Sequence, residues 1–247
     1  MPRPLRGAAG GAGAVTTRID RLIVVVPARN EESRLPRCLA ALADAVQALE
    51  EERGAAAPAV SVVVVLDRCT DGSADVVALW PQFRALECAA GSVGSARREG
   101  VAHLLCDAAA AHTWVATTDA DSAVPRRWLA VQLALAEAGT ELVLGTVLPD
   151  EELPVLERAR WHESHSLVDG HPHVHGANLA VRADRYLQAK GFSDVDSDED
   201  VLLVAALRTL GARECRTALI PVLTSGRLDG RVPGGFGGYL AGQVTTH

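Results

Sequence analysis

The sequence predicts a single α/β domain with a mostly parallel, Rossmann-like central sheet flanked by helices. Short runs of Val, Ile and Leu without polar alternation, at residues 22–27 and 60–66, are typical of strands buried on both faces. Each run is followed by a polar turn and a stretch with apolar residues at helical spacing, which favours parallel strands joined by crossover helices. A chain of 247 residues is long enough to bury the core of one such domain.

The first half of the chain alternates regularly between strand and helix patterns. Pro27 ends the first apolar run, and Leu35, Leu39 and Leu42 mark the buried face of the helix that follows. The elements expected here are strands at 22–27, 60–66, 83–88 and 114–118 and helices at 34–50, 73–80 and 95–111.

The second half is less regular and richer in charge and histidine. Pro125 is placed to begin a helix whose apolar face contains Trp128 and Leu135. The other elements expected are strands at 141–148, 178–182 and 218–224, helices at 151–168 and 200–210, and a Gly/Arg loop at 225–238.

Composition excludes several classes of protein. A formal net charge of -7 argues against a general nucleic-acid binder, which is usually basic. Five cysteines form no Cys-x-x-Cys or zinc spacing, which indicates a reducing compartment and therefore the cytoplasm. No apolar run approaches the ~18 residues of a membrane span, and residues 1–19 lack the apolar centre of a signal peptide. We expect those nineteen residues to form a disordered leader.

Two aspartates follow the fourth expected strand. Asp119 and Asp121 are two residues apart, so in extended backbone both side chains point to the same face. Carboxylate oxygens suit Mg²⁺ or Mn²⁺, ions that commonly complete their coordination with water and substrate phosphates. The pair therefore predicts a half-site for a phosphorylated substrate, although a polar strand end or a helix cap would show the same pattern.

Polar residues also follow the first two strands. In open parallel sheets ligands bind beyond the carboxyl ends of the strands, where residues 27–31, Asp67 and the aspartate pair meet. The loop is expected to hydrogen-bond a base and a ribose, and Asp67 to accept from a base N–H. A solvated loop with a capping role is the alternative.

Several segments, in order, resemble the family 2 glycosyltransferases with a GT-A fold. The segments that carry the resemblance are 22–32, 62–73, 91–100, 119–121, 176–182 and 191–203, so it covers roughly residues 20–240. Arg98 departs from the pattern, because asparagine is frequent there in the family. The resemblance implies a nucleotide-sugar-binding half at 20–122, an acceptor-binding half at 123–240 and a tail at 241–247.

The resemblance also implies roles for individual residues. Asp121 and Asp119 would bind the metal, and Asp200 would act as the catalytic base, with Glu199 as the alternative. The residues implied at the donor are Pro27, Ala28, Arg29, Asn30, Glu31, Asp67, Arg97, Asp119 and Ala120. Those implied at the acceptor are His175, Gly176 and Asn178.

Three further patterns have competing explanations. Arg227 and Arg231, four residues apart between glycines, suit a diphosphate clamp or a disordered tail. The acidic run 194–200 lacks the glycine and the spaced glutamate of an EF-hand loop, so an EF-hand calcium site is disfavoured and an acidic surface loop at a helix N-terminus is the alternative. Five histidines within residues 162–175 indicate either a transition-metal site or solvated loop chemistry. The family's further histidine ligand has only His247 as a counterpart after Asp200.

The sequence thus predicts a hexosyltransferase-type enzyme that moves a sugar from a UDP- or GDP-sugar to a hydroxyl acceptor. The resemblance implies inversion at the anomeric carbon and a need for Mg²⁺ or Mn²⁺. One alternative, a sugar-phosphate nucleotidylyltransferase, requires a Gly-rich, Arg-containing loop after the first strand, where this chain has Pro27-Ala28-Arg29-Asn30. A catalytically idle nucleotide-sugar-binding subunit is the second alternative. An NAD-type enzyme is disfavoured because no Gly-x-Gly-x-x-Gly follows a strand. Base, sugar, acceptor and oligomeric state are not encoded in these motifs.

Overall fold

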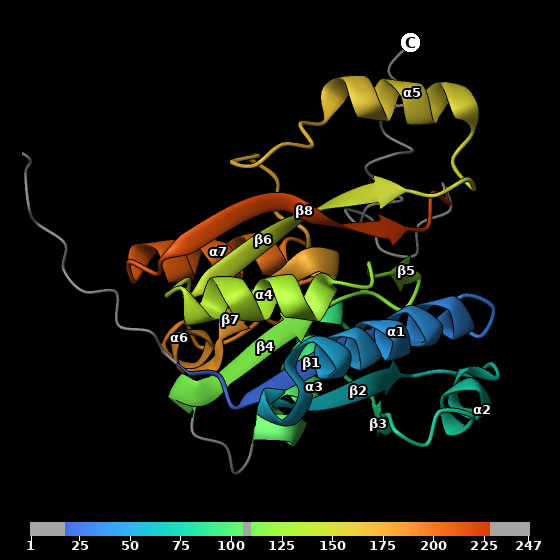
Figure 1. Ribbon diagram of the computed structural model, residues 1–247. Coiled ribbons are helices and arrows are strands. Elements are labelled where there is room, and N and C mark those ends of the chain that lie inside the picture. The colour runs from blue at the N-terminus through green and yellow to red at the C-terminus, as the bar shows by residue number, and fades with distance from the viewer. Residues whose placement is uncertain (1–17, 106–109, 228–247) are drawn as a thin grey trace, which may run out of the picture.

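The computed structural model describes residues 18–105 and 110–227, which form an α/β fold around one sheet (Figure 1). The strand order is β3-β2-β1-β4-β7-β6-β8-β5. The strands are β1 (Arg21–Ala28), β2 (Ala59–Asp67), β3 (Arg84–Cys88), β4 (Thr113–Thr117), β5 (Ser122–Ala123), β6 (Leu142–Pro149), β7 (Leu179–Arg182) and β8 (Glu214–Thr224). The helices are α1 (Leu35–Arg53), α2 (Ser73–Ala78), α3 (Val93–Leu105), α4 (Trp128–Glu137), α5 (Val155–Ser164), α6 (Ala183–Gln188) and α7 (Glu199–Thr209).

The mostly parallel sheet predicted from the sequence is confirmed. Strands β3, β2, β1 and β4 run parallel to one another, so their carboxyl ends lie along one edge. Strand β7 pairs antiparallel with both β4 and β6, whereas β6 and β8 are parallel. The edge at which β1, β2 and β4 end is where ligands bind in open sheets of this kind.

Helices cover both faces of the sheet and bury separate cores (Figure 1). Val24 and Val26 of β1 pack on the side of α1 and α4, while Ile23 and Val25 pack on the side of α3 and α7. This alternation is the period of two expected of a strand buried on both faces. Gly100 lets α3 approach the sheet closely, because a Cβ there would lie 2.5 Å from Val25 Cγ1.

The observed elements differ from the expected ones in the second half. Helix α6 follows β7 directly and was not predicted, and the two-residue strand β5 pairs with the end of β8. A helix of six residues contains too few apolar positions to show periodicity. The helix expected at 151–168 is shorter, at Val155–Ser164, and β8 begins four residues earlier than expected. Within residues 18–105 and 110–227, no helix combines the length and the apolar character needed to span a membrane.

Candidate active site

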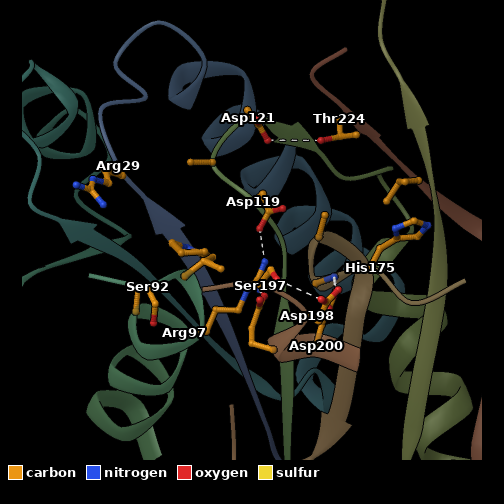
Figure 2. Close-up of a pocket in the computed structure, with 18 of the residues that line it drawn as sticks. Arg29, Ser92, Arg97, Asp119, Asp121, His175, Ser197, Asp198, Asp200 and Thr224 are labelled. Carbon is orange, nitrogen blue, oxygen red and sulfur yellow. Dashed lines mark hydrogen bonds and ion pairs between the residues drawn. The ribbon is translucent and has the colours of Figure 1, made fainter. Parts of the chain in front are cut away.

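A cavity of about 990 Å³ opens beyond the carboxyl ends of β1, β2 and β4 (Figure 2). Its far side is formed by the loop before η3 (Gly176–Asn178) and by the start of α7. The sequence-predicted residues that line it are Pro27, Ala28, Arg29, Glu31, Asp67, Arg97, Asp119, Ala120, Asp121, His175, Gly176, Glu199, Asp200 and Arg227. Residues up to 200 positions apart in the chain are thus brought to one cavity.

Hydrogen bonds hold the loops after β1 and β2 in place. The backbone N–H of Glu31 donates to Ser73 Oγ at 3.0 Å, which ties the loop after β1 to the start of α2. The Gly91 N–H donates to both carboxylate oxygens of Asp67, at 3.0 and 3.2 Å. Gly91 has φ +87°, a conformation that strongly favours glycine. The Asp67 carboxylate is therefore fixed at the edge of the cavity.

Asp121 and Asp119 both line the cavity, and burial next to a second carboxylate makes the charged form of Asp121 less favourable. Burial and the charge of Asp119 raise the pKa of Asp121 to about 6, although Arg227 lies 3.1 Å away and lowers it. Thr224 Oγ1 donates to Asp121 at 3.5 Å (Figure 2). Two carboxylates of this kind fit a divalent cation, which would offset their mutual repulsion.

The protein supplies only part of a coordination sphere. Across the described residues, no three His, Cys, Asp or Glu side chains are grouped as ligands for one metal ion. A cation at Asp121 and Asp119 would thus depend on water and on substrate oxygens for its other positions, as Mg²⁺ commonly does.

Arg227 links the end of β8 to the loop after β1. Its guanidinium contacts both carboxylate oxygens of Glu31, at 2.6 and 3.0 Å, as well as Asp121. The backbone around Arg227 is held in place, since the Gly226 N–H donates to Asp150 Oδ1 at 2.9 Å and the Arg227 N–H donates to Ser225 Oγ at 3.3 Å. A forked cation is thereby placed between the donor loop and the aspartate pair.

Arg97 is buried and joins two carboxylates. One terminal nitrogen lies 2.6 Å from Asp119 Oδ1, and the other is hydrogen-bonded to Glu199 Oε1. Its guanidinium also lies 5.6 Å over the ring of Phe192. Arg97 was expected beside the base or phosphates, but both of its terminal nitrogens are engaged by protein carboxylates. The structure therefore makes Arg97 a residue that positions Asp119 and Glu199.

Glu199 and Asp200 begin α7 in different environments. Glu199 is buried against Arg97, whereas Asp200 makes no ion pair within 4.0 Å in the described part of the chain. Asp200 accepts hydrogen bonds from the N–H groups of Gly176 at 2.6 Å and Val201 at 2.8 Å. Burial raises the pKa of Asp200 above its usual value, although Arg97 lowers it. Burial raises the pKa of Glu199 as well, so the two neighbours differ in their partners: Glu199 is ion-paired with Arg97, and Asp200 is held by backbone N–H groups.

Two predicted residues that the structure describes, Asn30 and Asn178, do not line the cavity. The Asn30 side chain accepts from the Thr70 N–H at 2.7 Å, with φ +54° at its own backbone, and so fixes the loop. Asn178, in η3, is 1% exposed and is not among the residues that line the cavity. Its amide donates to the carbonyls of Thr146 and Ile220, and its oxygen accepts from Trp128 Nε1. Arg231 lies outside the described residues.

We expect Asn178→Ala to destabilise the fold without changing the site. The substitution leaves three buried polar groups without their partner, which costs roughly 3 kcal/mol of unfolding free energy. Urea denaturation measures this loss, and Gln47→Ala, on the exposed face of α1, serves as a control with a change below about 0.5 kcal/mol. If Asn178→Ala is as stable as the unmodified protein but binds its ligands more weakly, Asn178 acts in the site and not in the fold.

Some cavity residues carried no assignment in the sequence. Ser92, Asp196 and Asp198 line the cavity, as do His165 and His173. The histidines belong to the cluster noted above, which the sequence alone could not place. Ser92 follows the glycine that binds Asp67, so the Gly-rich segment at 91–94 was the available signal.

The protein thus has an α/β sheet with carboxylates after β2 and β4 and a cavity beyond them, which is where open sheets of this kind bind their ligands. A sequence profile for the family described as Glycosyl transferase family 2 matches residues 23–182, more than half of the chain. The chain therefore belongs to glycosyl transferase family 2. No curated protein sequence matches it.

Solved structures share the fold at low sequence identity. S. aureus TarS 1-349 in complex with UDP has a TM-score of 0.61 at 16% identity, over 83% of this chain and 61% of that one. The mannosyltransferase PcManGT from Pyrobaculum calidifontis, in complex with GDP-Man and Mn²⁺, has a TM-score of 0.61 at 18% identity, over 85% and 58%. This chain thus spans about three fifths of the length of these neighbours.

A third similar structure comes from Mycobacterium tuberculosis. Its glucosyl-3-phosphoglycerate synthase, in complex with Mn²⁺, UDP and phosphoglyceric acid, has a TM-score of 0.53 at 17% identity. The match covers 80% of this chain and 68% of that one. At these identities the likeness establishes the GT-A fold.

Proposed function

We propose that this protein transfers a hexosyl unit from a UDP- or GDP-sugar to a hydroxyl acceptor, with inversion at the anomeric carbon. The observation that carries the proposal is the convergence of Asp67, Asp121 and Asp200 on one cavity at the carboxyl edge of the sheet. Family membership supports glycosyl transfer, and two neighbours are named with UDP and GDP-Man. We assign residues 20–122 to the donor and 123–240 to the acceptor. The cysteine pattern supports work in the cytoplasm.

The donor is assigned to the loop after β1 and to the residues around it. Pro27, Ala28 and Arg29 would contact the nucleoside, and the fixed Asp67 carboxylate would accept from the base. Arg227, already between Glu31 and Asp121, would turn its forked donors to the diphosphate, with Arg231 nearby in sequence.

A divalent cation, Mg²⁺ or Mn²⁺, fits Asp121 and Asp119. When bound, it supplies positive charge that stabilises the departing nucleoside diphosphate. Neighbours containing Mn²⁺ support this assignment. Arg97 holds Asp119 by one oxygen at 2.6 Å, which keeps the carboxylate pair in position.

Asp200 is assigned as the base. Its carboxylate takes the proton of the acceptor hydroxyl while that oxygen bonds to the anomeric carbon and the bond to the diphosphate oxygen breaks. His175 and Gly176, which adjoin Asp200, would contact the acceptor. Glu199 is neutralised by Arg97 and serves to hold the site together.

Calorimetry separates this proposal from its alternatives. We expect UDP or GDP to bind at least ~10-fold more tightly in Mn²⁺ than in EDTA, because the cation shields the diphosphate from the carboxylates. Slow hydrolysis of a nucleotide sugar to the nucleoside diphosphate should accompany binding. Equal nucleotide affinity in Mn²⁺ and in EDTA, without hydrolysis of the nucleotide sugar, indicates a catalytically idle binding subunit. Formation of a nucleoside triphosphate from pyrophosphate indicates a nucleotidylyltransferase.

A further inference from the structure

The side of the cavity opposite the donor loop has its own chemistry. His165, His173 and His175 reach it from the segment between α5 and β7, and Asp196, Asp198 and Asp200 reach it from the start of α7 and the loop before it. We call these six residues the His–Asp wall. Figure 2 shows His175, Asp198 and Asp200 across the cavity from Arg29.

The histidines of the wall form a stack. Ring centroids are 4.9 Å apart for His165 and His173, with planes 27° apart, and 5.8 Å for His173 and His175, with planes 25° apart. Trp161 stacks on His165, with ring centroids 4.2 Å apart and planes 9° from parallel. His173 Nε2 is buried and has no hydrogen-bond partner in the described part of the chain. The three imidazole rings and the indole thus form one continuous column that runs from Trp161 to His175.

The stack is uncharged near neutral pH. Burial lowers the pKa of all three histidines, in the case of His175 to about 3. A neutral imidazole has one nitrogen that donates a hydrogen bond and one that accepts. Such a surface suits hydroxyl groups, which also do both.

The aspartates make the wall electronegative. The described cations that line the cavity are Arg29, Arg97 and Arg227, all outside the wall. Arg97 is paired with Asp119 and Glu199, and Arg227 with Glu31 and Asp121. Among the described residues, the His–Asp wall contains no positively charged side chain that would offset the negative charge of an anionic acceptor.

We propose that the His–Asp wall binds an uncharged, polyhydroxylated acceptor, a sugar or a polyol, and disfavours phosphorylated or carboxylated ones. The proposal rests on the function proposed above and adds the chemical class of its acceptor. Hydroxyls donate to Asp196 and Asp198 and exchange hydrogen bonds with the imidazoles, while the apolar face of the acceptor packs on the stack. An anion would instead meet several carboxylates at close range, which disfavours binding.

Matched pairs of acceptors test the proposal on the full chain with Mn²⁺ and the donor it hydrolyses. Glucose is compared with glucose 6-phosphate, glycerol with glycerol 3-phosphate, and inositol with inositol phosphate, by mass spectrometry of the sugar transferred and by competition. We expect the uncharged member to be preferred about 100-fold, the effect of like charges in contact. Equal or better use of the phosphorylated members overturns the proposal, as does failure of every uncharged sugar and polyol to accept or compete.

Two variants test whether the preference for uncharged acceptors depends on residues of the His–Asp wall. Asp196→Lys should reduce the preference for the uncharged acceptor about 10-fold, while Asp75→Lys, on the exposed start of α2, leaves it unchanged. His173→Ala should raise the acceptor KM about 10-fold, unlike His162→Ala, which alters a histidine outside the cavity lining. If Asp196→Lys keeps the full preference for the uncharged acceptor, the proposal that the His–Asp wall selects the acceptor is contradicted.

Nucleotide affinity keeps the two proposals apart. UDP and GDP affinity should change less than about twofold in Asp196→Lys and His173→Ala, because neither residue is among those assigned to the donor. Absent metal-dependent nucleotide binding in the unmodified chain contradicts the proposed function itself. Intact nucleotide binding with a preference for phosphorylated acceptors contradicts only the acceptor class.

Discussion

Asp200→Asn is expected to lower turnover by about 10²–10⁴-fold, the usual range for losing a general base. The amide keeps the shape of the side chain and can still accept from Gly176, but it cannot take the proton of the acceptor. Nucleotide affinity should stay within about twofold, since Asp200 is not among the residues that we assign to the donor. Steady-state turnover of the donor, with calorimetry of UDP or GDP, measures both quantities.

Glu199→Gln is the matched comparison. Glu199 is 5% exposed and paired with buried Arg97, so this substitution leaves the guanidinium without one of its two carboxylates. We expect lower stability, by roughly 2 kcal/mol, because a buried charge loses a partner. If Glu199→Gln instead folds normally and shows the large loss of turnover while Asp200→Asn does not, the roles of the two neighbours are reversed.

Asp121→Ala is expected to abolish metal-dependent donor binding. The substitution removes the more buried carboxylate of the pair and leaves Asp119 engaged with Arg97. Affinity for UDP or GDP in Mn²⁺ should fall about 100-fold, to the value that the unmodified protein shows in EDTA. Calorimetry with and without Mn²⁺ measures the change.

An exposed carboxylate provides the control for this prediction. Asp75→Ala, at the start of α2, removes the same charge from a position outside the cavity lining. This variant should keep the response to Mn²⁺. An Asp121→Ala protein that binds the nucleotide in Mn²⁺ as tightly as the unmodified protein would rule out Asp121 as a metal ligand.

The sheet edge could be predicted because its signals are local. Uninterrupted apolar runs identify β1, β2 and β4, and the residue after a buried strand lies at the sheet edge whatever the rest of the chain does. Asp67, Asp119 and Asp121 were placed correctly at the cavity for this reason. Strand β5 was not predictable, because two residues form a strand only by pairing with β8, about one hundred positions away.

The interior of the site depends on contacts that no local pattern encodes. Arg97 was expected near the base or phosphates because the segment 91–100 resembles a family motif. In the structure α3 packs against α7 and brings the Arg97 guanidinium to Glu199. Asn178 was expected at the acceptor because the segment 176–182 resembles the acceptor-side pattern of the family. Its amide is buried against carbonyls of β6 and β8, strands whose positions the residues around it do not specify.

Analysis of the products from a panel of nucleotide sugars tests the central claim most directly. The protein, Mn²⁺ and an uncharged sugar or polyol are incubated with UDP- and GDP-hexoses, and the products are separated by mass spectrometry. We predict that one donor yields its nucleoside diphosphate and a glycoside one hexosyl unit heavier than the acceptor, and that Asp200→Asn yields neither at a comparable rate. Recovery of every donor intact, or release of a hexose phosphate and a nucleoside monophosphate instead, would contradict glycosyl transfer at this cavity.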